Sequence, residues 1–212
     1  MKTDDFISAL AADETRSATG PGTMLWLAIA GGALAACAAF FVLLGPRPDF
    51  MQAIGTVRFV FKFAISLVLA ASALVALRRA MRPEMGDKPL HAVLLAAPAL
   101  LAVAVVLELV AVPGADWATR WIGHNWLYCM TFIPILSLAP LAVLLFVLRG
   151  GASTAPARTG AVAGILAGGI GAFFYAAHCP DDSPLFVASW YTIAVGIVTV
   201  LGALAGARLL RW

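Results

Sequence analysis

Residues 160–207 read GAVAGILAGGIGAFFYAAHCPDDSPLFVASWYTIAVGIVTVLGALAGA, two long apolar runs that are joined by a short polar turn at 178–184. Each run is close to the roughly 20 residues that a helix needs to cross a bilayer. Because unpaired backbone groups and charges are costly in lipid, we expect the turn at a membrane edge. A thiol, an imidazole and two carboxylates crowd into it. Such a cluster favours sensing, binding or chemistry over simple anchoring.

The whole chain shares this apolar character. Of its 212 residues, 62% are hydrophobic and 12% are charged, and the mean hydropathy of +0.96 is far above that of an ordinary soluble domain. Six apolar stretches of span length follow one another, at 24–44, 57–77, 90–110, 126–148, 160–177 and 185–207. The sequence predicts an all-α polytopic membrane protein, a bundle of six transmembrane helices with short loops. Only residues 1–23 are polar and long enough to work outside the membrane, so the predicted domains are 1–23 and 24–212, and we expect no enzyme.

The positions of the lysines and arginines predict the orientation of the bundle. Ten of the fourteen lie in the amino-terminal tail, in the second and fourth loops and at the carboxyl end. The exceptions are Arg47, Arg58, Lys62 and Arg120. By the positive-inside rule both termini are cytoplasmic and the turn at 178–184 faces outward. The net charge of +3 reflects this bias, so we expect no direct binding of nucleic acid.

Two of the three cysteines are expected at one depth, near the outer surface. Cys129 follows an aromatic run that is typical of a membrane interface, and Cys179 begins the outer turn. A disulfide between them would need α-carbons within about 7 Å, which the sequence does not show. Cys37 is expected to be a small buried residue in the middle of the first span.

Two readings of the polar outer groups stay open. His124, His178, Asp181 and Asp182 could join the two outer cysteines in a soft-metal site, of which Cys129, Cys179 and His178 are the strongest candidates. The chain has no C-x-x-C or H-x-x-x-H spacing to support it. Alternatively, one of the aspartates caps the sixth span, in which Ser183 and Pro184 mark the first turn.

Small and charged residues inside the spans predict how the helices pack. Gly160, Gly164 and Gly168 recur every four residues, and Gly196, Gly202 and Gly206 thin the next span, so these two helices should pack tightly. Pro98, Pro134 and Pro140 suggest kinks. Arg58 and Lys62 share one helical face. We expect them to pair with Glu108, or with Asp49, Asp181 or Asp182, and a structural ion pair is at least as plausible as a functional one.

The amino-terminal tail contains a short acidic amphipathic segment. Asp4 and Asp5 open it, and Phe6, Ile7 and Leu10 fall on one side of a helix. Because so short a helix is unstable alone, we expect it to fold on a partner protein, and its negative charge argues against anionic lipid as that partner. The alternative is a frayed tail that binds nothing.

These features together resemble the NrsF family of bacterial membrane anti-sigma factors. The resemblance rests on the acidic start of the tail, the six spans, the cysteine at the outer end of span four, and the string H-C-P-D-D-S-P at 178–184 with Ser189-Trp190-Tyr191 after it. It implies a multi-pass protein of the bacterial inner membrane that holds an extracytoplasmic-function sigma factor through its amino-terminal segment.

The resemblance also implies a signal and its sensor. Heavy-metal or oxidative stress would act on Cys129 and Cys179, shift the outer ends of spans four and six, and release the sigma factor. We expect the neighbouring residues to support this sensor loop, namely His124, His178, Pro180, Asp181, Asp182, Ser183 and Pro184. No cofactor is implied beyond a transient thiophilic metal ion as the signal, and the sequence predicts no particular oligomeric state.

Two other classes of protein stay open as alternatives. A small metal-ion or solute transporter would need polar groups along a path to the cytoplasm, and the inner halves of the spans are apolar. A membrane thiol oxidoreductase would need a C-x-x-C or a second cysteine pair, and only Cys37 remains.

Overall fold

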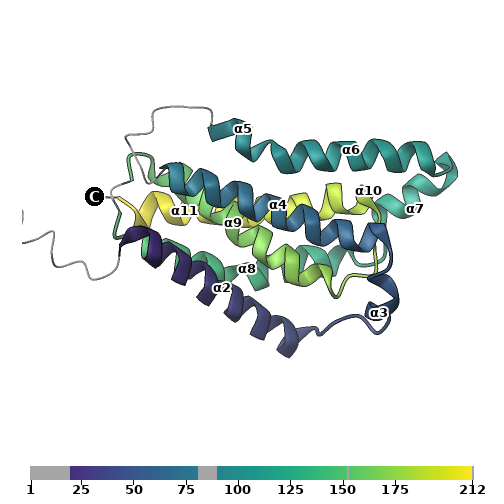
Figure 1. The fold of residues 1–212 in the computed structure, drawn as a ribbon, viewed down its shortest axis with the longest axis horizontal. Helices are drawn as coiled ribbons and strands as arrows, with labels where there is room; N and C mark the ends of the chain where they lie inside the picture. Colours follow the sequence, from purple (N-terminus) through teal and green to yellow (C-terminus); the bar gives the residue numbers. More distant parts are fainter. Residues whose placement is uncertain (1–19, 81–89, 152, 212) are drawn as a thin grey trace, which may run out of the picture.

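The computed structural model describes residues 20–80, 90–151 and 153–211, and within these residues every regular element is helical (Figure 1). The amphipathic segment with Asp4, Asp5, Phe6, Ile7 and Leu10 lies outside the described residues.

Six of the described helical stretches are long and apolar enough to cross a membrane, as the sequence predicts. They are Gly22–Leu43, Val57–Ala80, Ala92–Ala111, Trp126–Leu148, Pro156–Ala176 and Pro184–Leu209. Their ends differ from the predicted ones by no more than four residues, the largest difference being at the start of the fifth. The fifth helix begins earlier because Pro156 can occupy the first helical position, where no backbone N–H is needed.

The individual elements are named as in Figure 1. The long helices are α2 (Pro21–Leu43), α4 (Val57–Ala80), α6 (Ala96–Ala111), α8 (Trp126–Leu148), α9 (Pro156–Ala176) and α11 (Thr192–Leu209). The short ones are α3 (Phe50–Ala53), α5 (Leu90–Leu94), the 3-10 turn η2 (Gly114–Asp116), α7 (Trp117–Ile122), α10 (Pro184–Phe186) and the π-helical turn η3 (Val187–Tyr191).

Helix α9 lies at the centre of the bundle and α6 lies at its edge. In their most apolar stretches 78% of residues are buried for α9 and 11% for α6. Helix α9 packs against α4, α8 and α11, whereas α6 buries only Ala97 and Glu108. Residues of the polar turn therefore follow the most enclosed helix of the fold.

The predicted tight contact between the fifth and sixth spans is confirmed. A Cβ on Gly164 would lie 2.6 Å from the Val198 carbonyl oxygen, and one on Gly206 would lie 2.7 Å from the Gly160 Cα. Only glycine lets these backbones approach so closely. Gly196 is different, since nothing lies within 4 Å of its Cβ position, so the expectation that it thins this contact is wrong.

The prolines have two different effects. A break at Leu95 separates α5 from α6, three residues before Pro98. Proline favours such a break because its ring clashes with the carbonyl of the preceding turn and because it has no N–H to donate. Pro134 and Pro140 lie inside α8, which continues from Trp126 to Leu148 without interruption.

The connections at one end of the bundle are more structured than the short loops predicted from the sequence. Helices α3 and α7 lie at the same end as the turn 177–183, and the first and last described residues lie at the opposite end (Figure 1). This turn, the two helical connections and the adjoining ends of α4 and α6 form what we call the polar end, residues 44–62, 108–125 and 177–183.

Candidate functional site

The polar turn is fixed to the rest of the bundle through Lys62, a cation with no exposed surface. Its Nζ lies 2.6 Å from Asp182 Oδ1 and donates to the Cys179 carbonyl oxygen, also at 2.6 Å. Lysine is rarely buried unless it is paired. Here a carboxylate and a carbonyl replace the water that the ammonium loses, so α4 is tied directly to the backbone beside Cys179.

Arg47 makes a second set of bonds to the same atoms. Its Nη1 donates to Asp182 and, at 3.3 Å, to the Cys179 carbonyl oxygen, while its backbone N–H donates to the Ala177 carbonyl oxygen at 3.0 Å. The guanidinium also pairs with Asp49 at 2.6 Å. The hydrogen bond to Asp49 is the main reason why the pKa of Arg47 is raised and the pKa of Asp49 is lowered.

Sequence reasoning missed the role of Arg47. The one available signal was its position in an outer loop, which the positive-inside rule leaves poor in basic residues.

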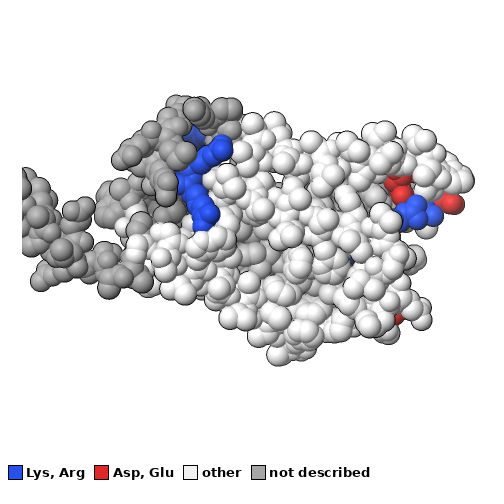
Figure 2. Space-filling model, viewed as in Figure 1, with Lys and Arg blue, Asp and Glu red and all other residues white. Residues whose placement is uncertain are grey.

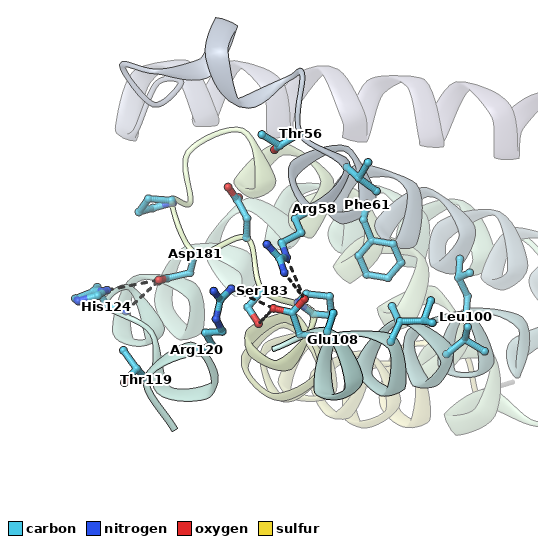
Figure 3. A pocket seen from close by; sticks show the side chains of 18 residues that line it. Thr56, Arg58, Phe61, Leu100, Glu108, Thr119, Arg120, His124, Asp181 and Ser183 are labelled. Carbon is cyan, nitrogen blue, oxygen red and sulfur yellow. Dashed lines mark hydrogen bonds and ion pairs between the residues drawn. The ribbon is translucent and has the colours of Figure 1, made fainter. Parts of the chain in front are cut away.

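A second buried charge, Glu108, joins three elements of the polar end (Figure 3). Its carboxylate is 4% exposed and accepts from Arg58 at 2.9 Å and from Arg120 at 3.3 Å. The Ser183 hydroxyl also donates to it, at 3.4 Å. Glu108 is thus the predicted partner of Arg58, whereas Lys62 pairs with Asp182, the alternative that the sequence left open.

Asp181 and Ser183 accept hydrogen bonds from the backbone of two different segments. Asp181 Oδ2 accepts from the backbone N–H groups of His124 and Asn125, at 3.0 and 2.8 Å, just before α8 begins. Ser183 is the N-cap of α10, and its hydroxyl accepts from Leu185. The expectation that an aspartate caps the sixth span is therefore wrong, because Asp181 satisfies the free N–H groups ahead of the fourth span instead.

The two histidines are engaged away from the cysteines. His178 Nδ1 lies 3.0 Å from the Gly45 carbonyl oxygen, so Nδ1 carries the proton and donates. His124 is 3.7 Å from Asp181 and its side chain is 86% exposed. Within the described ranges no three His, Cys, Asp or Glu side chains are arranged to hold a metal ion. The six-residue metal set considered from the sequence is therefore not assembled.

The two outer cysteines lie in one buried cluster and are both free thiols. Cys129 and Cys179 have no exposed surface and pack with Tyr175, Phe186 and Tyr191. Burial raises the pKa of Cys179 above that of an ordinary thiol. The third cysteine, Cys37 on α2, is partly buried, whereas the sequence predicted a buried residue.

Two buried hydroxyls border this thiol cluster. Tyr175 and Tyr191 have ring centroids 5.9 Å apart, and neither hydroxyl has a hydrogen-bond partner among the described residues. Tyr191 closes the π-helical turn η3, whose extra residue changes the direction of the side chains after Pro184. Buried hydroxyls without partners are uncommon, and no sequence pattern predicts them here.

The remaining residues of the predicted string hold the connections together. Pro180 is exposed at the tip of the turn and Pro184 is the first residue of α10. Ser189 accepts from the Trp121 ring N–H at 2.6 Å, and the Trp190 ring N–H donates to the Trp121 carbonyl oxygen. Helix α7 is thereby bound to η3.

These observations define the class of protein as an all-helical bundle with six helices long and apolar enough to cross a membrane, and with one internally paired polar end. The chain belongs to the NrsF family, since the family model described as negative regulator of sigma F matches residues 10–212. The predicted family resemblance is confirmed.

Two curated relatives match the full length of the chain. It is 36% identical to the anti-sigma-F factor NrsF of Caulobacter vibrioides and 32% identical to the probable anti-sigma-F factor NrsF of Azospira oryzae, with all of each chain covered. No solved structure matches the chain significantly.

Proposed function

We propose that this protein is a membrane-bound anti-sigma factor that sequesters a sigma factor through residues 1–23 and releases it in response to a signal at the polar end. The full-length match to a family described as negative regulator of sigma F carries this proposal. Both relatives are named for sigma F, so a sigma factor of that kind is the expected partner, and its assignment to the extracytoplasmic-function class belongs to the proposal.

The partner-binding segment is tested by co-purification from detergent extract. We expect the full chain to retain a sigma factor and a chain without residues 1–22 to lose it. Within the full chain, Phe6→Ala combined with Leu10→Ala should weaken binding, because these side chains share one face of the predicted helix. Ser8→Ala on the same segment is the matched control. Equal retention of the sigma factor by the truncated chain would refute this part of the proposal.

We propose that Cys129 and Cys179 together receive the signal. Both thiols sit in one cluster, and the Cys179 carbonyl accepts from Lys62 and Arg47. An oxidant of the peroxide class could take two electrons and two protons from the pair and leave a disulfide, or a thiophilic divalent ion could displace the two thiol protons. Either product would displace the turn that Lys62 and Arg47 hold.

The glycine contact between α9 and α11 offers a route from the polar end to the opposite end. It extends from Gly168 against Val195 to Gly160 against Gly206. A closely packed pair of helices transmits a displacement because its backbones have no flexible side chains between them. A hundredfold loss of affinity for the sigma factor requires about 2.7 kcal/mol of coupling, within the range of known allosteric proteins.

The sensor proposal is tested with a reporter gene that depends on the released sigma factor. Cys129→Ser with Cys179→Ser should keep the reporter repressed but abolish its response to cadmium or peroxide. Cys37→Ser is the control and should respond as the parent does. A double variant with an unaltered response would exclude the two thiols as the sensor.

A further inference from the structure

A cavity of about 850 Å³ opens between α4 and α6 at the polar end. One part of it is apolar, and the part beside the turn 180–184, which we call its mouth, is charged (Figure 3). Phe61, Leu100, Val103 and Leu107 line the apolar part, and Arg58, Arg120 and Asp181 line the mouth. The volume is in the range of sites that hold small ligands, which are typically apolar with a few placed polar groups.

The two arginines at the mouth have N–H donors that are not used within the described residues. Arg58 bonds to Glu108 through Nε and Nη2, and Arg120 does so through Nη1. The described residues offer no hydrogen-bond partner to the remaining N–H groups of either guanidinium. The side chains are 44% and 36% exposed, so a ligand can reach both. Guanidinium groups bind phosphate oxygens particularly well.

Carboxylates also face the cavity, and their negative charge determines whether an anion or a zwitterion fits the site. Glu108 is shared by the two arginines, and Asp182 is paired with Arg47 and Lys62. Asp181 has only backbone N–H donors and the distant His124 ring. Two guanidinium groups against Glu108 and Asp181 leave the mouth neutral, with a positive side and a negative side. A zwitterion suits such a mouth better than an anion does.

The apolar wall extends the site along the membrane-spanning part of α6. Leu100, Val103 and Leu107 repeat at helical spacing on this helix and are between 39% and 64% exposed. The exposed aromatic rings of Trp117 and Trp121 lie on neighbouring α7, as expected at the level of lipid headgroups. Hence the charged mouth lies at the headgroup level and the apolar wall lies at the acyl-chain level.

We propose that this cavity binds a phospholipid with a zwitterionic, primary-ammonium headgroup. The phosphate accepts from the N–H groups of Arg58 and Arg120 that Glu108 leaves free, the ammonium lies beside Asp181, and an acyl chain follows α6. This site goes beyond the sequestration of a sigma factor and does not depend on it. Because residues 180–184 form one wall of the cavity, a bound lipid also contacts the turn that carries Cys179.

The site is tested by native mass spectrometry of the delipidated full chain. The probes are phosphatidylethanolamine, phosphatidylcholine, phosphatidylglycerol and inorganic phosphate, each added alone. We expect phosphatidylethanolamine to bind most tightly and Arg120→Gln to weaken it about tenfold, the effect of one lost charge-assisted hydrogen bond. Arg149→Gln, which removes an exposed arginine outside the cavity, should bind as the parent does.

A second variant tests the apolar wall without removing a charge. Val103→Trp fills this wall and leaves both arginines in place, so lipid binding should fall. Val110→Trp is its control, since Val110 is 82% exposed on the same helix and does not line the cavity. Equal lipid binding by Arg120→Gln, Val103→Trp and the parent would overturn the site. Equal or tighter binding of phosphatidylglycerol, or of inorganic phosphate, would overturn the assignment of the ligand.

Discussion

At the scale of single residues, the polar end is decided by two charges that have almost no contact with solvent. Lys62 is bound by Asp182 and a backbone carbonyl, and Glu108 is bound by Arg58, Arg120 and Ser183. Burying such charges is costly, and removing one partner leaves the other uncompensated. Removing one of these carboxylates should therefore lower the stability of the fold more than removing a surface ion pair would.

Asp182→Asn should lower the free energy of unfolding by about 3–5 kcal/mol, because the fully buried Lys62 would keep only neutral acceptors. It should also speed the reaction of Cys179 with a maleimide, since the turn loses its main attachment. Thermal unfolding in detergent and the labelling rate measure the two effects. Asp49→Asn is the control, because Asp49 is half-exposed and pairs with Arg47 alone. Equal effects of the two substitutions would contradict the role given to Asp182.

The raised pKa of Cys179 predicts a specific pH dependence of stability. The unfolded thiol titrates near its ordinary value of 9.0, whereas the folded thiol keeps its proton to higher pH. The folded state therefore binds more protons above pH 9, so this contribution to stability is complete below that pH and is lost as the pH rises through the folded pKa.

Thermal unfolding between pH 7 and pH 10.5 measures this effect when the parent is compared with Cys179→Ser. The difference in stability between the two should stay constant up to about pH 9 and then shrink in the parent. A difference that grows above pH 9 would mean that the folded protein stabilises the thiolate.

At the scale of helices, the contact of α9 with α11 depends on backbone approach. Gly164→Ala should destabilise the protein by about 1–3 kcal/mol, the usual cost of forcing an extra methyl group into a packed contact. Its Cβ would lie 2.6 and 2.7 Å from backbone atoms of Val198 and Thr199, which cannot rotate away. Thermal unfolding measures the change.

Gly196→Ala is the matched control on the partner helix α11. Its Cβ position is open, and alanine is the better helix former, so we expect no loss of stability and at most a small gain. Similar losses for Gly164→Ala and Gly196→Ala would show that close backbone approach does not hold the two helices together.

At the scale of the whole molecule, the two ends differ in how their charges are used. At the polar end Arg47, Arg58, Lys62 and Arg120 each pair with a carboxylate. At the opposite end Arg78, Arg149 and Arg158 form no ion pair with a described residue. On the face shown in Figure 2, blue and red atoms adjoin at the polar end, whereas at the other end the described residues show blue atoms without red ones. An excess of basic residues at one end is typical of a cytoplasmic face.

The orientation is tested by single cysteines in a chain that lacks the natural three. Thr119→Cys at the polar end should react with an impermeant maleimide on intact cells, and Thr154→Cys at the opposite end only after the membrane is opened. Both side chains are exposed, so access is set by the membrane alone. The reverse pattern of labelling would place both termini outside.

Much of the architecture is determined by the sequence itself. Six apolar runs of span length predict six helices, because a helix pairs all of its backbone N–H and C=O groups within one segment, as hydrocarbon requires. The spacing of Gly160, Gly164 and Gly168 fixes the tight contact with the next helix, since three small residues four apart share one face. The string at 178–184 with its following Ser-Trp-Tyr was specific enough to indicate the family.

Only the tertiary structure decided which charges meet, because partners such as Arg47 and Asp182 are 135 residues apart. Helical periodicity places a side chain on a face but does not say which loop crosses that face. For the same reason Asp181 binds the backbone ahead of α8 rather than capping the sixth span, and both outer cysteines are fully enclosed. Beside these cysteines lie two tyrosine hydroxyls that have no hydrogen-bond partner among the described residues. These features depend on the packing of distant segments, which local sequence patterns do not encode.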